Sequence, residues 1–263
     1  MSAKIPSTAL YANQIESPPR LNGSLTNSAF SISLIAFTLG AVFGLSLLPG
    51  LSVINLDLSA IIPTALHSTQ VSLYLVILCW FHLWEFLSTA GWNMTKTSVD
   101  SYLLNNGYSY IAAHAFGLVS HYLLILFYPS ISQNHYLIIS GLALVVVGQV
   151  LRTLAMVHAS ESFSHHVASF KQKDHKLVTN GVYRIVRHPS YLGFYLWALG
   201  TQMILTNPLS FIAFAIILHR FFTDRIKHIL LILADEETYL VKFFGNDYQS
   251  YKNNVYSFFP YII

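Results

Sequence analysis

The residues best suited to chemistry lie in the C-terminal half of this 263-residue chain, where basic side chains meet long apolar runs. His188-Pro189 begins one such run and follows Arg184 and Arg187. Proline suits the first position of a helix, and the free N–H groups and the dipole of that helix end attract anions. The pattern predicts either a site for a carboxylate or phosphate, or an Arg/His anchor at lipid headgroups.

Three further charges stand inside apolar runs. Arg225 has Phe221-Phe222 before it and Ile229 to Leu233 after it. A charge within such a run is costly and is a functional candidate by default; an arginine that reaches out to lipid phosphates is the alternative. Glu85 and Arg152 lie at similar depth in two earlier runs. They are candidates for a buried ion pair, and the alternative is that each reaches the membrane surface separately.

Six apolar runs must position these residues, and each is close to the ~20 residues that cross a bilayer. They cover residues 28–48, 68–88, 108–128, 135–158, 189–206 and 208–233. Hydrophobic residues make up 54% of the chain and charged residues 10%, which argues against a soluble or disordered protein. Asn207-Pro208 is a turn signal, so the last two runs should form a tight helical hairpin. We expect an all-α polytopic integral membrane protein with about six transmembrane helices.

The placement of lysine and arginine predicts the orientation in the membrane. The expected loops 49–67 and 129–134 contain neither residue, whereas loop 159–188 contains five. The positive-inside rule therefore puts both termini and loop 159–188 in the cytosol. We expect three regions: a flexible cytosolic tail over 1–27, a four-helix membrane region over 28–158, and a region over 159–263 that holds the hairpin, the chemical candidates and a cytosolic C-terminal segment.

Several classes of protein lack their sequence signatures here. The single cysteine, Cys79, excludes an internal disulfide framework and a multi-cysteine zinc site. Twelve histidines are present, but residues 162–166 lack the first histidine of the H-x-x-H-H box that membrane di-iron enzymes use, and no second box exists. There is no G-x-G-x-x-G run and no phosphate-binding loop motif. We expect no metal, and with so few charges the net charge of +3 reflects topology rather than a nucleic-acid partner.

A long ordered set of motifs runs through the C-terminal half and is strongest over 149–263. It comprises Leu177-Val178, Gly181-Val182-Tyr183, Arg187-His188-Pro189-Ser190-Tyr191-Leu192-Gly193, Gly200-Thr201-Gln202, Asn207-Pro208, Arg220-Phe221-Phe222, Asp224-Arg225, Glu236-Glu237, Phe243-Phe244-Gly245 and Tyr251-Lys252. The set resembles the isoprenylcysteine carboxyl methyltransferase family, above all its fungal members. R-H-P-x-Y alone is shared with wider membrane methyltransferases and sterol reductases, so the whole ordered set carries the resemblance.

The resemblance implies methylation of the C-terminal carboxylate of a prenylated cysteine by S-adenosyl-L-methionine. It implies an endoplasmic reticulum membrane protein with its active site on the cytosolic face. The implied partners are the lipid bilayer and the farnesyl or geranylgeranyl cysteine of CaaX-processed proteins, such as Ras-like proteins and farnesylated pheromones. Arg225 is implied as the catalytic and substrate-binding residue, because a guanidinium fits a carboxylate two-pronged. The implied cofactor-binding residues are His175, Lys176, Leu177, Val178, Tyr183, His188, Pro189, Ser190, Tyr191 and Glu236.

Two features depart from the family pattern. Ala168 stands where many relatives place a polar residue near the adenine. The family's glutamates follow the arginine by about one helical turn, whereas His228 to Asp235 intervene here. This insert consists mostly of apolar, strongly helix-forming residues and should prolong the final helix. In a straight helix Glu236 would then stand about 16 Å from Arg225; a segment that loops out and a gene-model error are the alternatives.

Two other function classes stay open. An NADPH-dependent membrane sterol reductase shares R-H-P-x-Y, and competition by S-adenosylhomocysteine rather than by NADPH would exclude it. A non-catalytic channel or transporter would need polar residues at mid-depth in several spans, and most spans here are apolar at that depth.

Overall fold

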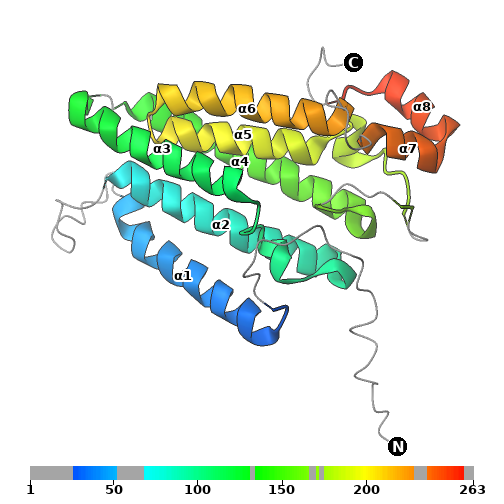
Figure 1. The fold of residues 1–263 in the computed structure, drawn as a ribbon, viewed down its shortest axis with the longest axis horizontal. Helices are drawn as coiled ribbons and strands as arrows, with labels where there is room; N and C mark the ends of the chain where they lie inside the picture. The colour runs from blue at the N-terminus through cyan, green and yellow to red at the C-terminus, as the bar shows by residue number, and fades with distance from the viewer. Residues whose placement is uncertain are drawn as a thin grey trace, which may run out of the picture.

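The computed structural model describes residues 26–51, 68–130, 134–165, 170–171, 175–227 and 236–257. The regular elements of this described part are all helices. Its eight α-helices are α1 (Ala29–Leu51), α2 (Thr69–Trp92), α3 (Tyr108–Phe127), α4 (His135–Ala159), α5 (Pro189–Ile204), α6 (Pro208–Lys227), α7 (Glu236–Phe244) and α8 (Asn246–Asn254) (Figure 1). Short 3₁₀ turns cover Met94–Lys96, Val99–Tyr102, Ser160–Ser162 and Gly181–Arg184. Most of the predicted tail and of loop 49–67, together with Ala168 and the insert 228–235, lie outside the described residues.

Four helices of the described part are long and apolar enough to cross a membrane. They are Ala29–Leu47, Thr69–Trp92, Tyr108–Phe127 and His135–Ser162, which match the first four expected spans. α5 and α6 match the fifth and sixth, but α5 has only 16 residues and α6 carries four charged residues from Arg220 onward. The described part is therefore all-helical with four helices that could span a membrane, and the expected count of six spans is not confirmed.

The expected hairpin at Asn207-Pro208 is present. Residues 205–207 join α5 to α6, which run antiparallel side by side (Figure 1). The side-chain oxygen of Asn207 accepts a hydrogen bond from the N–H of Ser210 at 3.1 Å and so satisfies a free donor at the start of α6. The amide nitrogen of Asn207 donates to Oγ of Ser120 at 2.6 Å. The turn thus fixes the hairpin to α3 as well.

α4 and α5 pack with their backbones almost in contact. A Cβ atom on Gly148 of α4 would lie 2.5 Å from the carbonyl oxygen of Gly193 and from the backbone nitrogen of Trp197 on α5. A Cβ atom on Gly200 of α5 would lie 2.7 Å from the carbonyl oxygen of Gly141. Small residues allow such close approach between helices in membranes. The packing brings the N-terminal turn of α5 against the last turns of α4.

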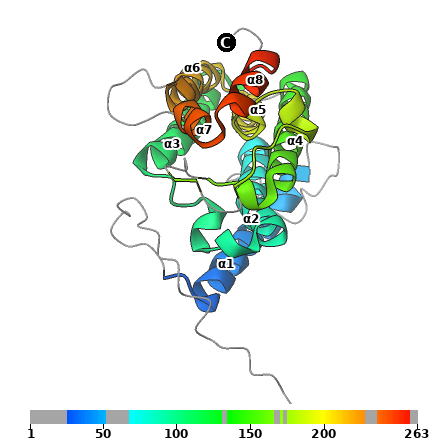
Figure 2. The same cartoon turned by 90° about the vertical axis from the view of Figure 1, so that its right-hand side faces the viewer.

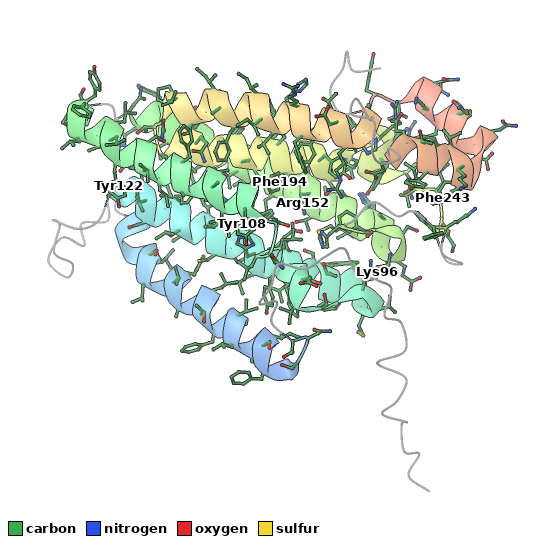
Figure 3. All side chains as sticks on the ribbon, in the orientation of Figure 1. Lys96, Tyr108, Tyr122, Arg152, Phe194 and Phe243 are labelled. Atoms are coloured by element: carbon green, nitrogen blue, oxygen red, sulfur yellow. The ribbon has the colours of Figure 1, made fainter. Side chains whose placement is uncertain are left out.

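The helices form a bundle with the charged segments gathered at one end. α2 packs against both α1 and α4, α3 contacts α6, and α7 and α8 lie near the N-terminus of α5 (Figures 1 and 2). A core that includes Phe81, Val145, Trp197 and Phe214 joins α2, α4, α5 and α6. Large apolar side chains also cover the outside of the helices, as Tyr122 does on α3 (Figure 3). Such an exterior suits contact with lipid.

Candidate functional site

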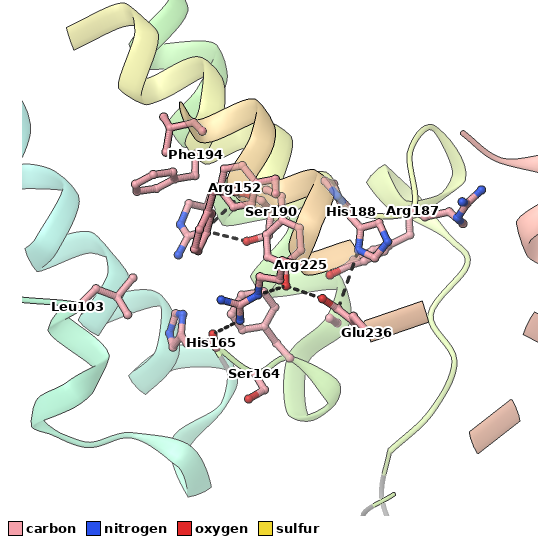
Figure 4. Close-up of a pocket in the computed structure, with 18 of the residues that line it drawn as sticks. Leu103, Arg152, Ser164, His165, Arg187, His188, Ser190, Phe194, Arg225 and Glu236 are labelled. Atoms are coloured by element: carbon pink, nitrogen blue, oxygen red, sulfur yellow. Dashed lines mark hydrogen bonds and ion pairs between the residues drawn. The ribbon is translucent and has the colours of Figure 1, made fainter. Parts of the chain in front are cut away.

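A cavity of about 420 Å³ lies where α3, α5, α6 and α7 converge (Figure 4). Every site residue predicted from the sequence lines it. These residues are His175, Lys176, Leu177, Val178, Tyr183, His188, Pro189, Ser190, Tyr191, Arg225 and Glu236. The tertiary structure therefore brings together the whole predicted set, which three separate segments of the chain contribute.

The polar end of the cavity is built on the start of α5. Pro189 is the first residue of the helix, and His188 directly precedes it. The N–H groups of Arg187 and His188 donate to the carbonyl oxygens of Tyr256 and Ser257 at 2.7 and 3.1 Å. The C-terminal segment thus fixes the entry to the helix. The first turn lines the cavity, so its N–H groups and dipole can stabilise an anion there, which is one of the two alternatives that the sequence left open.

One tyrosine hydroxyl joins Arg225 to Glu236. Nε of Arg225 donates to the Tyr191 oxygen at 2.8 Å, and the same hydroxyl donates to Oε2 of Glu236 (Figure 4). Nη2 of Arg225 donates to the backbone oxygen of His165 at 2.8 Å. The Tyr191 ring lies parallel to the His188 ring, with centroids 5.5 Å apart and planes within 4°. These contacts fix the direction of the guanidinium.

The position of Glu236 contradicts a straight extension of α6. α6 ends at Lys227, and Glu236 begins α7. Because Arg225 and Glu236 contact the same hydroxyl, they do not stand the ~16 Å apart that a continuous helix would impose. Glu236 therefore lies beside Arg225, although residues 228–235, which are outside the described part, separate the two in the sequence. Helix propensity did not predict where Glu236 lies, because the contacts of Arg225 and Glu236 with Tyr191 bring the two side chains to one place.

The next residue, Glu237, has a different environment that the sequence did not reveal. Its side chain is 5% exposed and forms ion pairs with Arg187 at 2.7 Å and Lys252 at 2.6 Å. Burial by itself raises the pKa of Glu237, but the hydrogen bonds from His188 and Lys252 and the charge of Arg187 outweigh it and hold the pKa well below its usual range. Glu237 is not among the residues that line the cavity. It links α7 to α8 and to the segment directly before α5 instead.

Glu85 and Arg152 form the buried ion pair that the sequence allowed. Nε and Nη2 of Arg152 donate to the two carboxylate oxygens at 2.5 and 2.9 Å. Nη1 donates to Oγ of Ser190 at 2.9 Å, and the guanidinium lies 5.6 Å from the ring centroids of Phe81 and Phe194 (Figure 4). Arg152 therefore reaches the cavity at the first turn of α5. Arg152 was not predicted to lie in the site. The depth of Glu85 and Arg152 in their own spans predicts a possible pair, but it does not predict the contact of Arg152 with α5.

Segment 175–178 forms one wall of the cavity near α7. The ring of His175 meets Phe243 and Phe244 edge-on, with centroids 5.8 and 5.5 Å apart. Burial and two nearby lysines lower the pKa of His175, which favours the neutral imidazole. The N–H of Lys176 donates to Oγ of Ser162 at 3.1 Å. The segment is thus attached at one edge to α7 and at the other to the turn that follows α4.

The turn at Asn180-Gly181 places Tyr183. Gly181 has φ +56°, and a Cβ atom there would lie 2.4 Å from the His158 ring, so only glycine fits. The Tyr183 hydroxyl donates to the carbonyl oxygen of Ala155 at 3.2 Å, and burial raises its pKa. Tyr183 is therefore fixed against α4 while it lines the cavity.

An apolar arm extends from the polar end into the bundle. Its walls are Tyr110, Ala113 and His114 of α3, Phe194, Trp197 and Ala198 of α5, and Phe214, Ile217, Leu218 and Phe221 of α6. Along α6 the arm reaches about 16 Å from Arg225 to Phe214. Ile217 and Phe221 line the arm and are also 64% and 51% exposed, so the arm borders the outer surface of α6. These residues were not predicted, because an apolar helix stripe has the same sequence pattern whether it faces a core or a tunnel.

Comparison with known proteins gives a consistent match. Residues 141–242 match the model of the isoprenylcysteine carboxyl methyltransferase (ICMT) family. The chain is 43% identical over 197 residues to the protein-S-isoprenylcysteine O-methyltransferase of Saccharomyces cerevisiae, which covers 73% of this chain and 80% of that protein. It is 39% identical over 245 residues to the enzyme of the same name from Schizosaccharomyces pombe, which covers 88% and 95% of the two chains.

The fold has a solved counterpart. The structure of the eukaryotic intramembrane Ras methyltransferase ICMT superposes with a TM-score of 0.78 at 34% identity. The match covers 90% of this chain and 79% of that chain. Similarity at this level extends over the membrane helices as well as the motif-rich C-terminal half.

Proposed function

The chain belongs to the isoprenylcysteine carboxyl methyltransferase family, and on this premise we propose that its cavity is the active site, with S-adenosyl-L-methionine as the methyl donor. The reaction of the family, methylation of the carboxyl group of isoprenylcysteine, is the activity of this enzyme. The position of Arg225 is the observation that supports the cavity as the active site, because Arg225 lies where the polar end of the cavity meets the apolar arm. A prenylated cysteine has the same two parts, a carboxylate and a hydrocarbon chain.

The chemistry asks for positioning rather than for proton transfer. A C-terminal carboxyl group has a pKa of about 3.5 and is ionised near pH 7, so no general base is needed. When bound, S-adenosylmethionine supplies a methyl group that is attached to a sulfonium, and the sulfur of this sulfonium is the leaving group. The protein has to hold the two reactants in line, and such orientation can contribute several kcal/mol to the barrier reduction.

The polar end fits a cofactor of this kind. The first turn of α5 offers N–H groups to the methionyl carboxylate, with His188, Pro189, Ser190 and Tyr191 on one side. The backbone of 175–178 and Tyr183 would form the other walls, and Glu236 would accept a donor group of the cofactor. The hydroxyl of Tyr248, which also lines the cavity, is buried and has no hydrogen-bond partner among the described residues. Such an unpaired group is costly, and a polar ligand would satisfy it.

Arg225 would bind the substrate carboxylate, and the apolar arm would take the prenyl chain. Tyr191 and the backbone of His165 each accept one hydrogen bond from the guanidinium, which limits its motion. Arg152 lies at the same cavity, but Glu85 compensates its charge. The exposure of Ile217 and Phe221, which line the arm, supports entry of the chain from the bilayer. We propose Ras-like proteins and farnesylated pheromones as the natural substrates.

We further propose the endoplasmic reticulum membrane as the location, with six spans, both termini in the cytosol and the active site on the cytosolic face. The gathering of α7, α8 and the start of α5 at one end of the bundle supports a single charged face (Figure 1). Residues 28–158 would form the membrane region and 159–263 the catalytic region, although α3 and α4 also line the cavity. A glycosylation tag placed after Ile263 should stay unmodified, and a glycan on it would reject this orientation.

The decisive experiment is methyl transfer from labelled S-adenosylmethionine to N-acetyl-farnesylcysteine in membranes that contain this chain. S-adenosylhomocysteine should inhibit, and NADPH should not. His188→Ala and Tyr183→Ala should weaken S-adenosylhomocysteine binding, because each removes a wall of the polar end. Unchanged affinity in both variants, in folded protein, would place the cofactor elsewhere.

A further inference from the structure

One phenol separates the two opposite charges of the site. We propose that the hydroxyl of Tyr191 keeps Arg225 and Glu236 from pairing directly, so that the arginine stays available to the substrate carboxylate. Tyr191 is then a positioning residue that acts through Arg225. The inference rests on the proposed function, in which Arg225 binds the substrate and Glu236 lies at the cofactor.

The hydroxyl forms one hydrogen bond with each of the two charged groups. It accepts from Nε of Arg225 at 2.8 Å and donates to Oε2 of Glu236. The ring that carries it is held on stacked neighbours. Its centroid lies 5.5 Å from that of His188 and 4.9 Å from that of Phe222, with planes inclined by 4° and 20°. The hydroxyl therefore has little freedom to leave its position between the two groups.

Without this hydroxyl the two charges should meet. Arginine and a carboxylate favour two parallel N–H···O bonds, which occupy the fork of the guanidinium. The Glu236 side chain is 26% exposed, so water screens the attraction only in part. A direct pair would use the same donor geometry that a substrate carboxylate needs. In the structure, no hydrogen bond between described residues uses Nη1 of Arg225.

The same cavity shows what happens where nothing separates opposite charges. Arg152 holds Glu85 through two bonds of 2.5 and 2.9 Å. Arg187, another residue that lines the cavity, contacts Glu237 at 2.7 Å. Arg225 and Glu236 are the exception among these three arginine–glutamate neighbours, and Tyr191 is the group that distinguishes them. Packing alone would need only the ring, whereas the separation needs the hydroxyl.

Tyr191→Phe tests the separation because it keeps the stacked ring and removes the hydroxyl. The kcat/KM for N-acetyl-farnesylcysteine should fall by about 10-fold or more, as expected for directly coupled neighbours. S-adenosylhomocysteine affinity should stay within about threefold, since the ring that lines the cavity remains. Adding Glu236→Gln removes the competing charge. The double variant should then have nearly the activity of Glu236→Gln alone.

Tyr195→Phe is the matched control. Tyr195 lies one turn further along α5, donates to the carbonyl oxygen of Ala215 at 3.3 Å, and does not line the cavity. Its loss should leave methyl transfer unchanged, and an equal fall in this variant would overturn the proposal. So would a loss of less than about threefold in Tyr191→Phe, or a double variant about 10-fold or more below Glu236→Gln.

Two further outcomes are informative. If Tyr191→Phe alone does not fold, the comparison of the double variant with Glu236→Gln still decides, because neither of these variants has a Glu236 carboxylate that lacks its hydrogen-bond donor. If the unaltered enzyme transfers no methyl group to N-acetyl-farnesylcysteine, the proposed function fails, and this inference fails with it. If the unaltered enzyme is active and Tyr191→Phe leaves its kcat/KM unchanged, this inference alone is rejected.

Discussion

Glu237→Gln should destabilise the enzyme far more than Glu236→Gln, although the two residues are adjacent. The Arg187 and Glu237 side chains are 3% and 5% exposed. Removing one charge of a buried pair leaves the other uncompensated, at a cost of about 3–5 kcal/mol. Glu236 is 26% exposed, and glutamine can still accept the Tyr191 hydrogen bond, so its replacement should cost about 1 kcal/mol or less. At about 2–4 °C per kcal/mol for a domain of roughly 200 residues, Glu237→Gln should melt about 6–20 °C lower.

The assay is the apparent melting temperature of the purified enzyme in detergent micelles at pH 7, at one scan rate for all variants. S-adenosylhomocysteine should raise the melting temperature of the unaltered enzyme by binding only the folded state. Glu236→Gln should melt near the unaltered enzyme but lose part of this ligand-induced rise. Equal melting temperatures for the two glutamine variants would refute the separate roles of the two glutamates.

The pH dependence follows from the direction of the pKa shift. Contacts in the folded state lower the pKa of Glu237, while an unfolded glutamate titrates near about 4.3. Its ion-pair contribution is therefore complete above about pH 5 and is lost as the pH falls through the depressed folded-state pKa. The difference in melting temperature between the unaltered enzyme and Glu237→Gln should be constant from pH 6 to 8 and should narrow only in acid. A difference in melting temperature that widens toward acid would refute the lowered pKa of Glu237.

Three further results are expected. Arg225→Ala should lower the methyl-transfer rate by about 30- to 1000-fold, or ~2–4 kcal/mol, while S-adenosylhomocysteine still binds. Arg225→Lys should recover only part of this rate, because lysine cannot bind a carboxylate through two parallel hydrogen bonds. Full recovery of the rate would mean that only the charge of Arg225 matters. Gly148→Leu should cost about 3 kcal/mol or more in a melting assay, because its Cβ would meet α5 backbone, whereas Gly44→Ala, with nothing within 4 Å, should cost about 0.5 kcal/mol or less. Arg152→Met should cost about 3–5 kcal/mol of stability, and adding Glu85→Leu should recover most of it; a fully additive double variant would reject the pair.

The sequence by itself determined the local features. Pro189 and Asn207-Pro208 act through backbone geometry and free N–H groups, so the start of α5 and the hairpin turn were predictable and are present. Span-length apolar runs gave α1 to α4, because burial in a bilayer depends on composition and length. The resemblance carried by the ordered motifs identified the predicted site residues, all of which line the cavity, but it identified neither Arg152 nor the apolar arm. The number of spans stayed open, since α5 is short and α6 ends in charges.

Only the tertiary structure decided how the charges are paired. Adjacent residues of a helix are about 100° apart, so Glu236 faces Tyr191 while Glu237 faces Arg187. The sequence contains the two glutamates but not the surfaces that α7 meets. Likewise, the insert before Glu236 suggested a longer helix, yet the glutamate lies beside Arg225. Helix propensity adds tenths of a kcal/mol per residue, whereas contacts between distant segments fix where a side chain lies.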